Sequence, residues 1–204
     1  MKKLLITVLI ASMLILPVSS VTPADAEGTL EEFLPGNATA EMAPAESMVP
    51  ALHGIVLAML NHNTQSFDRN DPQLAWESLY NMLSLYGQLD SRSVSDQDEL
   101  LFPEETVLDY AAALDIEPGQ LGDSPAALRD RLNYDNVSRC YAVVCGEDNL
   151  AQIRVDSVTT AKGSCLLTGA LVYEVENQVL ARFQAVFQPR DNMFGCAVTS
   201  LTLR

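Results

Sequence analysis

Residues 178–188 read QVLARFQAVFQ and alternate between apolar and polar side chains more clearly than any other part of the chain. Successive side chains of a strand point to opposite faces of a sheet, so this pattern predicts a strand with one face buried and one in water. The apolar positions are Val179, Ala181, Phe183, Ala185 and Phe187, and the polar ones are Arg182, Gln184 and Gln188.

Four further stretches with strand character surround this segment, at residues 139–145, 151–161, 164–175 and 194–203. The dipeptides Lys162-Gly163 and Glu176-Asn177 and the segment 189–192 are the turn signals between them. Residues 164–175 are apolar on both faces and are therefore expected at the centre of the sheet. The C-terminal part thus predicts one curved antiparallel sheet of about five strands.

The preceding part of the chain has helical periodicity instead. About four helices are expected, at 47–61, 71–87, from 103 to about 116, and 124–132, with a surface loop at 88–102. Ser47 is the expected N-cap of the first, and Asp71-Pro72 is the cap and first turn of the second. The first helix is apolar nearly all round, which is typical of a buried helix. Helices followed by strands predict an α+β domain over 47–204, with a helical half at 47–135 and a β-meander half at 136–204.

The first 26 residues predict a cleavable signal peptide. Lys2 and Lys3 precede 13 uncharged residues, Leu4 to Leu16, and Ala24-Asp25-Ala26 is an A-x-A cleavage site. Such a run is too short to cross a bilayer, which takes about 20 residues. We therefore expect a secreted or cell-envelope protein with no membrane span after the signal is removed. Residues 27–46, rich in Ala, Glu and Pro, predict a disordered acidic arm.

Charge is distributed unevenly along the chain. Residues 47–135, called the acidic half below, hold 15 Asp and Glu against four Arg, whereas residues 136–204 hold six acidic and six basic residues. Because affinity for nucleic acids and for anionic membranes comes mainly from Lys and Arg, both partners are disfavoured. The acidity is explained either by solubility or by a binding face for a basic partner.

Three segments carry a resemblance to a known group of proteins. They are Pro103-Glu104-Glu105-Thr106-Val107, Tyr110-Ala111-Ala112-Ala113-Leu114 and Tyr134-Asp135, which leads into the strands. In this order the elements resemble small secreted NTF2-like or cystatin-like bacterial proteins, including uncharacterised clostridial ones. The resemblance implies helices packed into the concave face of a curved sheet. It transfers no active-site residue, and such folds serve enzymes, binders and inhibitors alike.

All four cysteines, Cys140, Cys145, Cys165 and Cys196, lie in the strand half. An even number in an exported protein predicts candidate disulfides, with buried free thiols as the alternative. Cys140 and Cys145 are five steps apart, about 16 Å along a strand, which is too far for a bond. Two pairings remain, Cys140–Cys165 with Cys145–Cys196, and Cys140–Cys196 with Cys145–Cys165.

No residues form a recognised catalytic, cofactor or metal motif, so no cofactor is expected. His53, Trp76 and Tyr80 are the candidates to line a pocket between the first helix and the sheet, although core packing also accounts for them. The acidic pairs Asp98-Glu99, Glu104-Glu105 and Glu147-Asp148 fall at helix starts and turns.

The leading functional hypothesis is a non-enzymatic exported binding protein whose partner is an extracellular protein, a peptide or a small ligand. A specific form is an acidic inhibitor or modulator of cell-wall proteins. The alternatives are an NTF2-like enzyme or small-ligand binder with a pocket beside the first helix, and a structural envelope component.

Overall fold

The computed structural model describes residues 45–204 except 97, 146–149 and 162, and all of the described residues belong to one compact unit. The predicted signal peptide at 1–26 and most of the predicted arm at 27–46 lie outside the described residues. At the end of that arm Ala45 and Glu46 are helical and Ala45 is fully buried, so these two residues are part of the folded domain.

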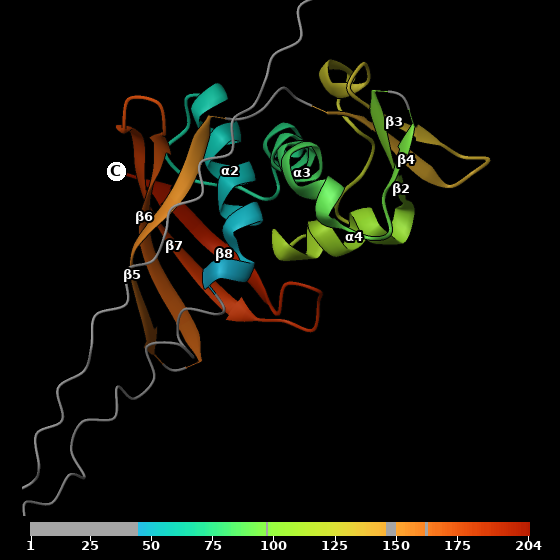
Figure 1. Cartoon of the computed structure of the whole chain (residues 1–204). Coiled ribbons are helices and arrows are strands. Elements are labelled where there is room, and N and C mark those ends of the chain that lie inside the picture. Colours follow the sequence, from blue (N-terminus) through green and yellow to red (C-terminus); the bar gives the residue numbers. More distant parts are fainter. Residues whose placement is uncertain (1–44, 97, 146–149, 162) are drawn as a thin grey trace, which may run out of the picture. The chain divides into compact units, whose positions relative to one another are not determined.

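The larger sheet is an antiparallel meander in the order β5-β6-β7-β8 (Figure 1). Its strands are β5 (Ala151–Ala161), β6 (Ser164–Tyr173), β7 (Gln178–Pro189) and β8 (Cys196–Leu203). The expected strands at these positions are confirmed, and β6 is an inner strand. The alternation in β7 holds at Phe183, Ala185 and Phe187, which are buried, but Val179 is 37% exposed. A bulge, where Leu171 pairs with Ala181 but Val172 with Val179, disturbs the pattern there.

A second antiparallel sheet, with the order β1-β2-β4-β3, corrects the expectation of one five-stranded sheet. Its strands are β1 (Val94–Asp96), β2 (Glu99–Pro103), β3 (Leu132–Asp135) and β4 (Cys140–Val144). The expected strand at 139–145 belongs to this sheet and not to the meander. Because β1, β2 and β3 all precede residue 136, the helical half also contributes three strands.

The main α-helices of the described residues are α2 (Val49–Asn61), α3 (Pro72–Tyr86) and α4 (Glu104–Ala113). Asp71 caps α3 as expected, because its carboxylate accepts from the backbone N–H groups of Gln73 and Leu74. Ser47 does not cap α2; Met48 holds that position, and the Ser47 hydroxyl donates to the Phe194 carbonyl at 2.8 Å.

Two further expectations for the helical half are wrong. The segment 88–102, expected as a loop, contains a short 3₁₀ helix η1 (Gly87–Leu89) and strands β1 and β2. Leu100 and Phe102 alternate with less buried neighbours in β2, and their burial against the core explains the strand. The helix expected at 124–132 is only a 3₁₀ turn, η2 (Ala126–Leu128), before β3.

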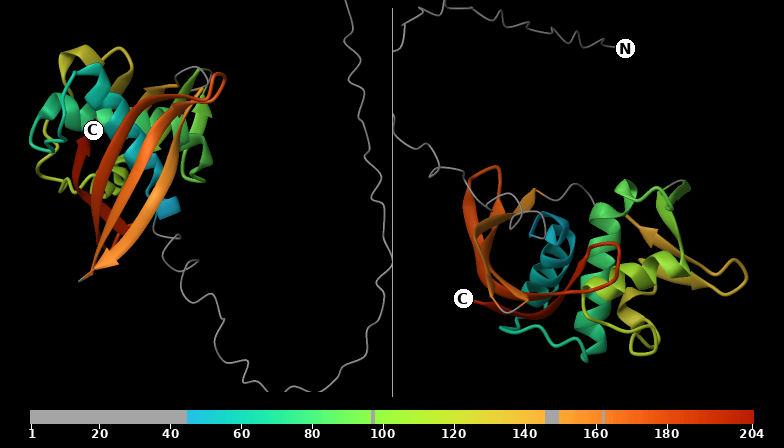
Figure 2. Two further views of the ribbon diagram at one scale, coloured as in Figure 1. Left: turned by 90° about the vertical axis from the view of Figure 1, so that its left-hand side faces the viewer. Right: turned by 90° about the horizontal axis from the view of Figure 1, so that it is seen from below.

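The helices lie between the two sheets (Figures 1 and 2). Helix α2 contacts β5, β7 and β8 on one side and α3 on the other, while α3 contacts β4 and α4. Gly54 allows α2 to approach α3 closely, since a Cβ there would lie 2.5 Å from the Ser78 carbonyl oxygen. One continuous apolar core therefore joins both sheets through these helices. None of the described helices has the length and apolar character that a membrane crossing requires.

Candidate functional site

The space between α2 and the β5–β8 sheet is occupied by side chains. The inner face of the sheet carries apolar residues that are no more than 1% exposed: Leu167, Phe183, Ala185, Phe187, Val198 and Leu201. They pack in one cluster with Leu52, Ile55 and Met59 of α2. This confirms the expectation that α2 is a buried helix.

His53, also on α2, is buried and bonds to a tyrosine of α3. Its ring is 3% exposed, its Nδ1 lies 2.7 Å from the Tyr86 hydroxyl, and the two rings meet edge to face. Burial lowers the pKa of His53 to about 4 and raises that of Tyr86 to about 12, because a buried site disfavours the charged form of each. Both groups are therefore neutral at pH 7, and a histidine of this pKa is a weak general base.

Trp76 and Tyr80 lie on α3 and use their polar atoms to hold other parts of the chain. The Trp76 indole N–H donates to the Leu121 carbonyl at 2.9 Å, and the Tyr80 hydroxyl donates to the Val144 carbonyl at 3.1 Å. Trp76 is 1% exposed and Tyr80 is 6% exposed. Their described contacts share no residue with those of His53, so the structure does not bring the three candidates into one pocket.

The four cysteines are free thiols and lie in two separate sheets. Cys140 is in β4 and Cys145 directly follows it, whereas Cys165 and Cys196 lie in β6 and β8. Both predicted pairings would have to join the two sheets, and the structure shows neither. It instead brings Cys165 near Cys196: burial, together with the neighbouring Cys165, raises the pKa of the Cys196 thiol.

Several acidic side chains are engaged in ion pairs. Asp115, at the end of α4, pairs with both Arg69 and Arg190, and Glu104 pairs with Arg139 at 2.5 Å. The arginine lowers the pKa of Glu104 through this hydrogen bond. The pair Glu147-Asp148 lies outside the described residues. Across the part of the chain that the structure describes, no three His, Cys, Asp or Glu side chains gather in a way that could hold a metal ion.

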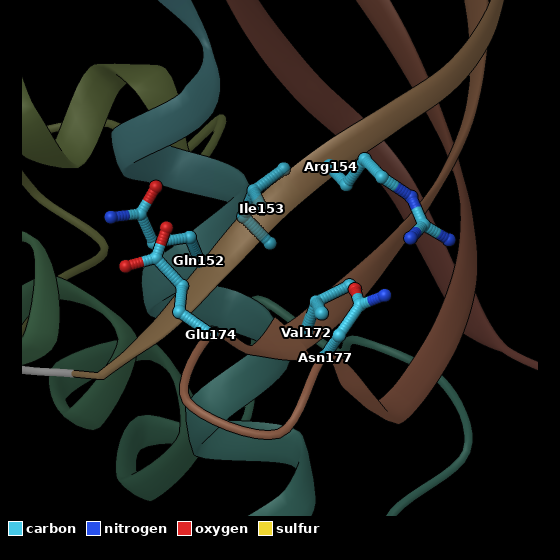
Figure 3. Close-up of a pocket in the computed structure, with 6 residues that line it drawn as sticks. All are labelled: Gln152, Ile153, Arg154, Val172, Glu174 and Asn177. Carbon is cyan, nitrogen blue, oxygen red and sulfur yellow. The ribbon is translucent and has the colours of Figure 1, made fainter.

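An open cavity of about 360 Å³ lies where β5 and β6 meet the turn before β7 (Figure 3). Its lining combines a guanidinium, a carboxylate, two amides and two aliphatic side chains: Gln152, Ile153, Arg154, Val172, Glu174 and Asn177. None of these residues stands out in the amino-acid sequence as a site candidate. The turn signal Glu176-Asn177 pointed to the hairpin, and Asn177 has the positive φ of 50° that such turns favour. The turn signal does not predict the register between β5 and β6, and it is this register that brings the lining residues together.

Protein-family models, curated proteins and solved structures were compared with this chain, and none of them matches it. The resemblance to NTF2-like and cystatin-like proteins therefore rests on the sequence pattern alone.

Proposed function

We propose that this chain is an exported, non-enzymatic binding protein that engages a basic extracellular protein through its acidic half. The observation that carries the proposal is the uneven charge, with 15 acidic and four basic residues at 47–135 and equal numbers beyond. A protein that binds through such a surface needs no catalytic group, only exposed charge arranged to match its partner.

The excess charge of the acidic half is available at the surface. Five of its acids take part in ion pairs. His62 pairs with Glu77, and Arg69 and Arg92 pair with Asp115, Asp90 and Asp109. Arginines of the other half pair with Glu104 and, a second time, with Asp115. The remaining acids are all exposed and take part in no described ion pair: Asp68, Asp71, Asp96, Asp98, Glu99, Glu105, Glu117, Asp123, Asp130 and Asp135.

The interior favours binding over catalysis. The pocket expected for an NTF2-like enzyme would lie between α2 and the sheet, where Phe183, Phe187 and Leu201 fill the space. His53, the base that such an enzyme would use, is neutral and already bonded to Tyr86. A basic cell-wall hydrolase, whose cationic surface attracts the acidic half, is the partner class that we propose.

The test is the binding of a basic cell-wall hydrolase of the lysozyme type, measured by interferometry at several salt concentrations. The variant Glu117→Gln/Asp123→Asn removes two exposed charges from the acidic half. The control variant Glu176→Gln/Asp191→Asn removes two from the other half. Charges at the rim of an interface act mainly on the association rate. We expect the first variant to associate about threefold more slowly at low salt and the control to match the wild type. Equal rates for both variants, or no saturable binding, would contradict the proposal.

A further inference from the structure

The open cavity beside β5 and β6 carries opposite charges at its two ends. In Figure 3 the side chains of Arg154 and Asn177 extend to one side, while those of Gln152 and Glu174 extend to the other. Each charged group thus has an amide beside it, and the aliphatic Ile153 and Val172 lie between the two ends. This alternation of cation, apolar centre and anion is suited to a ligand that is itself charged at both ends.

The guanidinium of Arg154 keeps donors for a ligand. Its only described ion pair is with Asp156, where one nitrogen, Nε, contacts Oδ1 at 3.2 Å. Asp156 also accepts from Arg182 at 3.3 Å, so that a single carboxylate serves two arginines. A guanidinium has five N–H donors and can bind a carboxylate through two parallel hydrogen bonds. Arg154 is 47% exposed, which leaves its outer nitrogens accessible from the cavity.

The register of the two strands sets the distance that a ligand must bridge. Arg154 of β5 pairs with Ala170 of β6, and Glu174 follows Ala170 by four residues. The backbone N–H of Glu174 donates to the Leu150 carbonyl at 2.8 Å. Four residues of a strand cover about 13 Å. About three extended residues of a peptide cover roughly 10 Å, and a hydrogen bond of about 2.9 Å at each end bridges the rest of this distance.

We propose that this cavity binds a short peptide of about three small residues, with its C-terminal carboxylate on Arg154 and its N-terminal ammonium at Glu174. Asn177 then lies beside the bound carboxylate and Gln152 beside the bound ammonium, and Ile153 and Val172 line the middle of the cavity, next to the small side chains of the ligand. The volume of about 360 Å³ accommodates such a ligand and lies within the range of small-molecule sites. This site is separate from the acidic half and does not depend on the partner proposed for it.

The test uses the full chain and the peptide Ala-Ala-Ala together with two capped forms. N-acetylation removes the ammonium and C-terminal amidation removes the carboxylate, so each cap deletes one of the two contacts. Binding is followed by NMR through the Nε–H signal of Arg154 and the side-chain amide of Asn177. We expect saturable shifts with the free peptide and at least a tenfold weaker affinity for either capped form, since each loses hydrogen bonds to a charged group.

Variants identify which end contacts which residue. Arg154→Gln should lower the affinity for the free peptide about tenfold and leave the affinity for the amidated peptide unchanged. Glu174→Gln should also lower the affinity for the free peptide about tenfold, but leave the affinity for the acetylated peptide unchanged. Both side chains are exposed, and Arg129→Gln, at an exposed site outside the cavity, is the control. Absence of saturation up to about 10 mM, equal affinity for free and capped peptides, or an equal effect of the control variant would overturn the proposal.

Discussion

The β5–β8 sheet and the β1–β4 sheet have the same number of strands but are assembled differently. In the larger sheet each strand has eight or more residues and pairs with the next strand in the chain. In the smaller sheet each strand has five residues or fewer, and β4 lies between β2 and β3, so that Leu101 pairs with Ala142. Hairpins between long neighbouring strands form locally, whereas the smaller sheet needs contacts across some 40 residues of sequence.

The two sheets also differ in what holds them to the helices. The larger sheet presents a face of apolar side chains to α2, and Phe183 is typical of it at 1% exposed. The smaller sheet is held in addition by a hydrogen bond from α3, in which the Tyr80 hydroxyl donates to the Val144 carbonyl of β4, while Trp76 of α3 holds the segment before η2 through the Leu121 carbonyl. One sheet thus depends mainly on burial, and the other depends on burial together with directed polar contacts.

The largest effect is expected from removing one buried phenylalanine from each sheet. Phe183→Ala and Phe102→Ala each delete a fully buried ring and should lower the free energy of unfolding by about 3–5 kcal/mol. Because both rings belong to one continuous core, we expect a single transition in each variant. Urea unfolding followed by fluorescence of Trp76, the one tryptophan in the sequence, and by far-UV circular dichroism measures this. Transitions that differ between the two signals would show that the sheets unfold separately.

A smaller, pH-dependent effect is expected from His53, which is buried on α2 and bonds to Tyr86 of α3. Its pKa is about 4 in the folded protein against 6.5 for the exposed side chain. Between these values the unfolded chain binds a proton that the folded protein does not, so stability is present above pH 6.5 and falls as the pH falls towards 4. The full contribution is about 3 kcal/mol.

The measurement for His53 is urea unfolding of the wild type and of His53→Gln from pH 7 to pH 4. Acidic residues titrate in both proteins, so the difference in slope between them isolates the histidine. Identical slopes for the wild type and His53→Gln would contradict the prediction.

The smallest effects concern two ion pairs near the smaller sheet, one with a buried carboxylate and one exposed to solvent. Arg92 pairs with Asp90, whose side chain is 5% exposed, and this contact lowers the pKa of Asp90. Arg92→Gln leaves that carboxylate without its charged partner and should cost about 1–3 kcal/mol at pH 7. The Asp90 contribution is lost as the pH falls below the ordinary pKa of the carboxyl, so the two proteins should converge in acid.

Arg139→Gln removes the contact with Glu104, where the arginine side chain is 75% exposed. Solvent screens such a pair, and we expect no change in the urea midpoint beyond experimental error. A loss for Arg139→Gln as large as that for Arg92→Gln would mean that exposed ion pairs, and not only covered contacts, hold the smaller sheet.

The amino-acid sequence by itself determined the strands of the β5–β8 sheet, the buried character of α2 and the start of α3 at Asp71. Each of these depends on residues close in sequence: alternation in a strand, an apolar helix, and a cap followed by proline. Only the tertiary structure decided the second sheet, because β1, β2 and β3 are too short to show a period in the sequence and because β2 pairs with β4, some 40 residues away. The same holds for the His53–Tyr86 bond, 33 residues apart, and for the cavity of Arg154 and Glu174. A pattern in the sequence shows which face a residue takes, but the register between elements decides which residue it meets.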